Sequence, residues 1–242
     1  MLSQDHSFSP SQINMGTSCP FRWNCYVRRL PTIKTETIYA NVGTVIHQSI
    51  ADYFDVINPE PNPGTIQGTF EQILERNWKS SGVKGLVSRK KRCLTNFIKF
   101  EKKRIKTWKQ YKPTLTEGKL KARINGITYT TIVDAYWSED ATIIDWKSGS
   151  VNRIGSSEKI QGQVMKMVVE AYGHPVERVI FVSLGLGLEL EMPKTTVGFV
   201  EDTVHRLKEY DKLQDFPIRR SKNCFFCGYQ LRCGLKDTCI WM

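Results

Sequence analysis

Long apolar runs are missing from the 242-residue chain. No stretch approaches the roughly 20 consecutive apolar residues that a membrane-spanning helix needs, so we expect no membrane segment. The first residues, MLSQDHSFSPSQ, lack a basic segment followed by an apolar stretch, which argues against a secretory signal and for an intracellular protein. The chain also lacks internal repeats, low-complexity segments and a G-x-x-x-x-G-K-(S/T) motif, which excludes a nucleotide-driven motor of that type.

Acidic residues are in the minority, because 24 aspartates and glutamates face 35 lysines and arginines. The formal net charge of +11 favours a polyanionic partner, since each neutralised phosphate releases condensed counterions. The simpler alternative is a soluble basic protein without such a partner, and charge alone does not exclude it. Hydrophobic residues make up 40% of the chain, which is enough for one sizeable core.

The chain begins with helical patterns, changes to strands after Pro113 and then returns to helices. Ser9 or Ser11 can cap a first short helix. The pair Asn125-Gly126 predicts a hairpin, and three prolines within residues 58–64 predict a loop. We expect helices at residues 43–54, 70–78, 89–111, 157–171 and 199–213, strands at 115–124, 127–137, 142–146 and 176–184, and a loop or hairpin at 185–193. This order predicts a single α/β domain, residues 1–242, whose mixed-sheet core is flanked by helices, with a helical insertion at about residues 55–112.

Two aspartates and a lysine stand where neighbouring strands are expected to end. Asp145 and Lys147 are two residues apart, so both side chains point to one face of a strand. A hairpin would bring Asp134 close to Asp145, and two such carboxylates repel each other unless a cation lies between them. Mg²⁺ or Mn²⁺ held there could polarise a phosphate, and Lys147 could stabilise the charge that develops on it. The alternative is an exposed ion pair before a turn, which the D-x-K pattern fits equally well.

Seven cysteines without a signal peptide indicate thiolate ligands rather than disulfides. Cys224, Cys227 and Cys233 follow C-x2-C-x5-C spacing, and four thiolates are needed to complete a tetrahedral metal site or a cubane cluster. The fourth ligand could be Cys239, which would make a local zinc knuckle, or Cys19, near the other end of the chain. Reduced thiols that bind nothing are a third alternative, and the spacing does not separate the first two.

His47 extends the carboxylate pattern. It follows Gly43 by four residues on an expected helix, where a lone histidine is otherwise a core or boundary residue. One helix, two strand ends and a later helix therefore carry an ordered set of residues: Gly43 and His47 in GTVIH, Asp134 in TIVD, Asp145 and Lys147 in IIDWKSG, and Gln161 and Gln163 in KIQGQVMKM. In this order they resemble the motifs of the RecB-like branch of the PD-(D/E)XK nucleases.

The resemblance implies a restriction-endonuclease-like fold and a catalytic metal site. The metal would be held by His47, Asp134, Asp145 and the backbone carbonyl of Trp146. Lys147 would be the catalytic lysine.

Three further positions follow from the same resemblance. Glu117, at the start of the first strand, matches an additional acidic position. We choose Gln163 over Gln161 as the glutamine of the catalytic set, because of its position between the D-W-K turn and Gly173. The chain departs from the family at the tyrosine expected four residues later, where Met167 or Met165 stands. The resemblance therefore implies no DNA contact by that tyrosine here.

The two ends of the chain resemble one subset of this branch. An S-P-S-x-(I/L)-N…C-P motif at residues 9–20 and the C-x2-C-x5-C trio resemble the iron–sulfur nucleases, which include the CRISPR-adaptation exonucleases and AddB-type nuclease domains. The resemblance implies a structural [4Fe–4S] cluster that joins the first helix to the tail, residues 222–242. Its ligands would be Cys19, Cys224, Cys227 and Cys233, while Cys25, Cys93 and Cys239 would be free or structural.

We therefore expect a Mn²⁺- or Mg²⁺-dependent exonuclease that acts on single-stranded DNA ends. Residues 89–112 are rich in lysine and arginine and could follow the DNA backbone, with Trp108 in the core. The alternatives are a non-catalytic DNA-binding or assembly protein that keeps the fold, and a zinc-ribbon adaptor. Besides DNA, the expected partners are proteins of CRISPR adaptation or repair and a second copy of the chain. The basic path could be extended by Arg22, Arg28, Arg29, Arg219 and Arg220.

Overall fold

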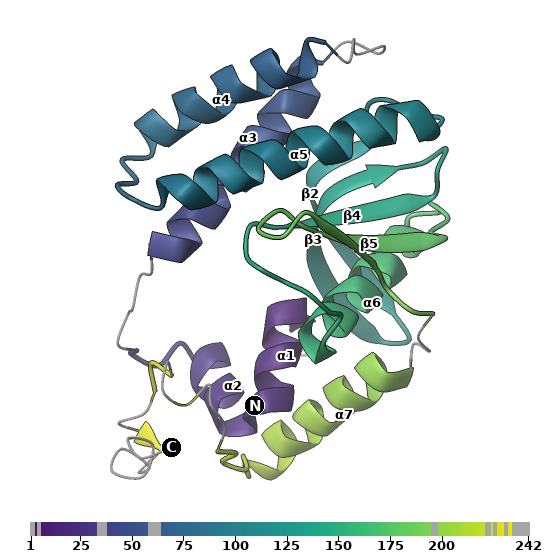
Figure 1. Ribbon diagram of the computed structural model, residues 1–242. Helices are drawn as coiled ribbons and strands as arrows, with labels where there is room; N and C mark the ends of the chain where they lie inside the picture. The colour runs from purple at the N-terminus through teal and green to yellow at the C-terminus, as the bar shows by residue number, and fades with distance from the viewer. Residues whose placement is uncertain are drawn as a thin grey trace.

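A six-stranded mixed sheet lies between two groups of helices (Figure 1). The computed structural model describes residues 3, 6–32, 38–57, 64–194, 198–220, 224, 227–229 and 232–233. The strands are β1 (Ser7–Phe8), β2 (Leu115–Ile124), β3 (Ile127–Trp137), β4 (Thr142–Lys147), β5 (Arg178–Ser183) and β6 (Leu188–Glu191). The helices are α1 (Pro10–Ser18), α2 (Pro20–Val27), α3 (Ile38–Val56), α4 (Ile66–Ser80), α5 (Val87–Thr107), α6 (Ser156–Ala171) and α7 (Gly198–Leu213).

Strand β3 is the centre of the sheet. It pairs antiparallel with β2 along one edge, while its other edge pairs first with β1 in parallel and then with β4 antiparallel. β4 continues in parallel to β5, and β5 pairs antiparallel with β6. Because β1 ends its pairing at Tyr129 and β4 begins at Ala135, the stretch of β3 between these two residues pairs with neither strand in the described part of the chain. The sheet is therefore split beside Asp134.

Helices α3, α4 and α5 cover one face of the sheet. Phe54 and Phe97 pack edge-on against Trp137 and Trp146 from β3 and β4. The apolar residues that recur at helical spacing in α3 are the ones buried in this core. Burying one such side chain contributes about 1.5–3 kcal/mol, so this aromatic cluster fixes the helices on the sheet.

Helix α6 covers the opposite face, and α1, α2 and α7 pack around its end. Val164 and Val168 of α6 meet Tyr129 of β3 in this second core. α1 approaches α7 closely at Gly16, where an added Cβ would lie 2.5 Å from the side chain of Leu207. The absence of a side chain at this position lets the two helices meet.

A buried arginine, paired within its own helix, holds α5 to the sheet. Arg104, 1% exposed, contacts Glu101 at 2.7 Å and stacks on Trp137 at 4.9 Å. Its guanidinium also donates hydrogen bonds to the carbonyl oxygens of Gln110 and Tyr111. The expectation that the basic residues of 89–112 contact DNA is therefore wrong for Arg104, because its charge is used inside the protein.

Most expected elements are confirmed, and α3 and α4 extend further than their apolar patterns, whereas the helix expected at 89–111 ends at Thr107 because Trp108 has an extended backbone. Ser9 caps α1 by accepting a hydrogen bond from the backbone of Gln12, and Trp108 is half-buried against the core as expected. The sequence pattern missed β1 and α2, which are short, and residues 185–193 contain the hairpin that ends in β6. Of the predicted loop, residues 58–63 lie outside the described residues. No described helix is long and apolar enough to cross a bilayer.

Candidate metal centre

Along β3, the side of the sheet on which alternate side chains pack is reversed at one position, Asp134. Val133 packs against the α6 side of the sheet, whereas Ala135, two residues later, packs against α3–α5. On a regular strand these two side chains would share a face. The change coincides with Glu117 on β2, which has a φ of 47° and is left out of the ladder opposite Asp134. A left-handed conformation is uncommon for a residue other than glycine, and such strain gathers at functional sites.

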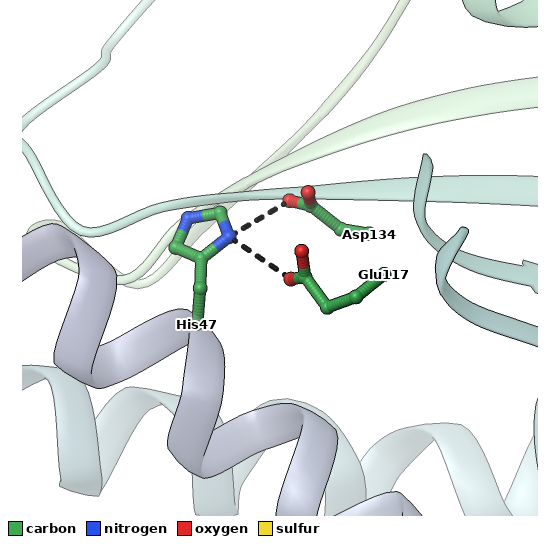
Figure 2. A group of neighbouring side chains, drawn as sticks. All are labelled: His47, Glu117 and Asp134. Atoms are coloured by element: carbon green, nitrogen blue, oxygen red, sulfur yellow. Dashed lines mark ion pairs between the residues drawn. The ribbon is translucent and has the colours of Figure 1, made fainter. Parts of the chain in front are cut away.

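His47 of α3 meets the two carboxylates that this reversal brings together (Figure 2). Its Nδ1 lies 3.3 Å from Oδ2 of Asp134 and 3.5 Å from Oε1 of Glu117. One ligand atom from each of the three residues lies within 4.8 Å of the others. One imidazole and two carboxylates from three different elements form a group that can hold a divalent metal ion.

Asp145, Lys147 and Gln161 form a second group beside the first. The Nζ of Lys147 lies 2.8 Å from Oδ2 of Asp145 and donates a hydrogen bond of 2.7 Å to Oε1 of Gln161. The amide of Gln161 in turn donates to Oδ1 of Asp145. The two groups are joined through the backbone N–H of Trp146, which donates to Oδ2 of Asp134 at 2.7 Å.

The electrostatics of the site favour a cation. Burial opposes a charge on His47, but hydrogen bonds to Asp134 and Glu117 outweigh it and raise the pKa of the imidazole to about 10. Burial and the nearby charge of Asp134 raise the pKa of Asp145 to about 7, although Lys147 acts in the opposite direction. Carboxylates this close favour a positive charge between them.

The structure brings Gln161, rather than Gln163, to this site. Gln163 is 3% exposed and lies two positions further along α6, about 200° around the helix axis. Our choice of Gln163 from the sequence is corrected by this geometry, because only one of the two side chains can face β4. The helix phase needed to make this choice depends on how α6 packs on the sheet.

The predicted metal ligands are found close together, but the positions of Asp145 and Glu117 differ from the prediction. Asp145 lies next to the group of His47, Asp134 and Glu117 rather than within it, and Glu117 completes the three. The side chain of Trp146 is buried in the α3–α5 core, so only its backbone faces Asp134. The sequence signal for Glu117 was a single acidic residue at a strand start, and no local pattern indicates its left-handed backbone.

A cavity of about 980 Å³ opens at the metal-binding group. Its walls come from α1, α2, α3, α6 and the β2–β3 hairpin, which are far apart in the sequence. Several lining side chains are small and hydroxylated, and two are basic. Among the lining residues are Ser9, Arg22, His47, Lys119, Asp134 and Gln161.

Helix α5 supports the turn that follows Lys147. The carbonyl oxygen of Ser148 accepts hydrogen bonds from Arg89 Nε at 3.0 Å and from Cys93 Sγ at 3.6 Å. A Cβ at Gly185 would lie 2.5 Å from the carbonyl oxygen of Gly149, so the next strand end packs directly against this turn. These contacts fix the backbone beside Lys147, and the sequence patterns did not indicate them.

The other basic residues of α5 divide into two sets. Lys90 pairs with Glu75 at 2.5 Å, and Lys103 pairs with Glu189 at 2.7 Å. Together with Arg89 and Arg104, they contact protein groups. The remaining exposed cations of the helix include Lys91, Arg92, Lys99 and Lys106.

The segment after α7 lies beside the first two helices (Figure 1). Phe21 of α2 donates a backbone hydrogen bond to Pro217, and Arg219 donates to the carbonyl oxygen of Thr17. Arg232 makes a similar contact with Pro31 at 3.4 Å. The segment after α7 therefore returns to the first two helices.

Several cysteines gather where the ends meet. Burial raises the pKa of Cys25, and the nearby thiols of Cys227, Cys19 and Cys233 add to this effect. The backbone N–H of Cys227 donates to the carbonyl oxygen of Cys224. Cys93 lies apart, on the buried face of α5, and Cys239 is outside the described residues. The described cysteines of both ends thus share one region of the molecule.

The chain resembles one known family along nearly its whole length. The PD-(D/E)XK nuclease superfamily matches residues 7–234. Among solved structures, the crystal structure of SSO0001 shares 12% sequence identity with the chain at a TM-score of 0.37, and the similarity covers 81% of this chain and 96% of that one. No curated protein matches the chain. The metal-binding group and the cysteines at both ends, except Cys239, lie inside the matched residues.

Proposed function

The chain belongs to the PD-(D/E)XK nuclease superfamily, and from this membership we propose that it is a metal-dependent exonuclease that hydrolyses phosphodiester bonds at single-stranded DNA ends. The observation that carries the proposal is the convergence of His47, Glu117 and Asp134 to within 4.8 Å. The net charge of +11 suits a DNA substrate. A cavity of about 980 Å³ suits a few nucleotides of one strand better than a duplex, which is why we propose single-stranded ends.

The donor set fits a hard divalent ion, and we propose Mn²⁺ or Mg²⁺. Carboxylate oxygens suit both ions, and the imidazole of His47 favours a transition metal such as Mn²⁺. We assign the ligands to His47, Asp134, Asp145 and the backbone carbonyl of Trp146, with Glu117 as a further ligand. When bound, the ion supplies Lewis-acid polarisation of the phosphate that is cleaved.

The neighbouring residues hold a positive charge beside that phosphate. The ammonium of Lys147 is fixed between Asp145 and Gln161, so it does not need to reorganise as negative charge develops on the phosphate. We propose that Lys147 stabilises this charge and that Gln161 keeps the ammonium in place. The hydrogen bond from Trp146 keeps Asp134 oriented toward His47.

End-labelled single-stranded and duplex DNA, incubated with Mn²⁺, Mg²⁺ or EDTA, tests this function. We expect shortening from an end that requires the metal, is faster on single strands, and is lost in Asp145→Asn and Lys147→Ala. The control is DNA binding, which Lys147→Ala should retain. Binding without cleavage by the wild-type protein under every metal condition would replace the exonuclease with a non-catalytic DNA-binding or assembly protein.

We further propose that the chain is a RecB-like nuclease of the iron–sulfur subset, with α4 and α5 as a helical insertion in one domain. A [4Fe–4S] cluster would be held by Cys19, Cys224, Cys227 and Cys233. The return of the segment after α7 to α1 and α2 supports this, because Cys19 stands at the junction of these helices. The tail is short and would gain its stability from thiolate ligation rather than from a core of its own. The partners that we propose belong to CRISPR adaptation or DNA repair.

Metal analysis of anaerobically purified variants tests the cluster. We expect about four irons and four sulfides per chain, and loss of both in Cys19→Ser. Cys239→Ser is the matched control, and it should keep the iron. Stoichiometric zinc without iron, lost in Cys239→Ser but kept in Cys19→Ser, would instead establish a local zinc knuckle.

A further inference from the structure

Three exposed cations alternate along strand β2. Lys119, Lys121 and Arg123 are exposed, whereas the residues between and after them are half-buried. The half-buried set, Leu120, Ala122 and Ile124, packs against the core around α6 and α7. The cations therefore all lie on the opposite face of the hairpin, and nothing in the apolar pattern of the strand requires that they be positive.

This face of the hairpin leads away from the metal-binding group. Lys119 lines the same cavity as Glu117 and Asp134, and it is the first of the three cations along the strand. The opposite strand places Ile132, Thr130 and Thr128 beside the cations on the same face. Ile132 is 46% exposed and lines the same cavity as Lys119.

The three cations are available to an external anion. Within the described residues, none of them takes part in an ion pair, in contrast to Lys90, Lys103 and Arg104 of α5. Helices α3–α5 pack on the same side of the sheet as the cations, but over its other half, where Ala135 and Trp137 lie. The apolar core that these helices form includes no residue of β2. Positive charge with no acidic partner thus continues outward from the cavity.

We propose that single-stranded DNA reaches the metal centre along this face, with its phosphates on Lys119, Lys121 and Arg123 and its bases over the β3 side. The proposal rests on the nuclease function proposed above and adds the route of the substrate. Alternate residues of a strand are about 6.8 Å apart, a spacing that can serve successive phosphates of one extended strand. Ile132 and the threonines of β3 then face the bases, without a pattern of donors that would select one sequence.

A second explanation exists for such cations. β2 pairs only with β3 in the described sheet, and lysines on an edge strand prevent pairing with another chain. That role needs charge but no DNA. The two explanations differ in what happens to DNA binding when the charges are removed.

Fluorescence anisotropy in EDTA separates them without relying on cleavage. The probes are labelled oligothymidylates of about 4 nucleotides, which fill only the cavity, and about 16 nucleotides, which also cross the hairpin. For the triple variant Lys119→Ala, Lys121→Ala and Arg123→Ala, we expect Kd for the long probe to rise by about tenfold or more. The slope of log Kd against log salt should fall by about 2, since each phosphate contact on a single strand contributes about 0.7. The short probe should bind nearly as before.

A matched triple variant on α5 controls for net charge. Lys91→Ala, Lys99→Ala and Lys106→Ala remove the same charge from exposed positions, and the salt slope should stay close to that of the wild type. A charge-retaining variant, Lys119→Arg, Lys121→Arg and Arg123→Lys, should also bind normally and guards against misfolding. The proposed route would be overturned if the α5 variant lost more affinity for the long probe than the β2 variant. An unchanged salt slope in the β2 variant would also overturn it. Wild-type protein that binds along β2 but cuts with neither Mn²⁺ nor Mg²⁺ would refute the nuclease function and leave the route standing.

Discussion

Single side chains at the metal centre are held by contacts that leave little freedom. Gln161 bridges Lys147 and Asp145, and Asp134 is held between His47 and the backbone of Trp146. Groups of this kind act as one unit, since moving any member removes a partner from the next. The consequences of substitution should therefore differ sharply between residues that face the site and neighbours that do not.

Gln161 and Gln163 provide a matched pair for this difference. Gln161→Ala should lower kcat about 10–100-fold, the usual effect of losing a group that orients a metal ligand or its neighbour. Gln163→Ala should leave kcat nearly unchanged and lower the free energy of unfolding by about 1–3 kcal/mol, because the buried amide is lost. Steady-state cleavage measures kcat, and urea unfolding measures the free energy of unfolding. Equal losses of kcat in the two variants would contradict the assignment of Gln161.

Metal affinity should rise with pH, because the ion must displace protons. The pKa of His47 is raised to about 10 in the metal-free protein, so its imidazole is protonated at neutral pH and must lose that proton to bind a metal. Between pH 7 and 9 we expect the logarithm of the Mn²⁺ association constant to rise with a slope of about 1. Below pH 7 the slope should steepen, since the pKa of Asp145 is about 7.

Calorimetric titration with Mn²⁺ across this pH range measures the slope. His47→Gln is the control, because it removes the titrating group and should flatten the dependence above pH 7. An affinity that does not change with pH between 7 and 9 in the wild type would contradict a protonated His47 that must lose its proton to bind the metal.

At the scale of elements, α5 connects the core to the turn that follows Lys147. Its N-terminal half holds the carbonyl of Ser148, its middle donates to Leu184 through Asn96, and its C-terminal half is fixed by the buried pair of Glu101 and Arg104. The helix was predicted as a basic DNA-binding surface. One of its cations, Arg89, instead positions the backbone that follows Lys147, and Lys90 and Lys103 pair with glutamates of the protein.

The buried pair should dominate the stability of this helix. Arg104→Met leaves Glu101 as an unpaired buried carboxylate and should lower the free energy of unfolding by about 3–5 kcal/mol. The double variant Glu101→Leu with Arg104→Met should recover most of this loss, because neither charge then remains without a partner. Urea unfolding at neutral pH measures both. A double variant as unstable as Arg104→Met alone would show that the carbonyl contacts of Arg104, rather than its charge pairing, hold the helix.

At the scale of the whole molecule, the segment after α7 closes on the first two helices. The contacts of Arg219 with Thr17 and of Pro217 with Phe21 hold the segment after α7 against α1 and α2. These are exposed or half-buried hydrogen bonds, each worth only about 0.5–1.5 kcal/mol. We therefore expect ligation of the cysteines to supply most of the stability of this closure.

Limited proteolysis should detect the loss of that ligation. With the cluster intact, trypsin should cleave slowly at Arg219 and Arg220, because the segment lies against α1. After oxidative removal of the cluster, cleavage there should become at least about tenfold faster, since local opening then controls the rate. Cleavage at exposed lysines of α5 is the internal control. Equal rates before and after removal would show that the hydrogen bonds alone close the ends.

The sequence by itself determined the features that depend on local periodicity. Alternation and the Asn-Gly turn predicted β2 and β3, two-residue spacing placed Asp145 and Lys147 on one face, and the C-x2-C-x5-C spacing marked the tail. Only the tertiary structure decided which side chains meet across these elements. Gln161 rather than Gln163 faces Asp145 because packing sets the rotation of α6, and Glu117 joins His47 because its backbone is left-handed. Arg104 is buried and the cations of β2 are exposed for the same physical reason: contacts between distant segments, which no local pattern encodes, choose the face that each helix or strand presents.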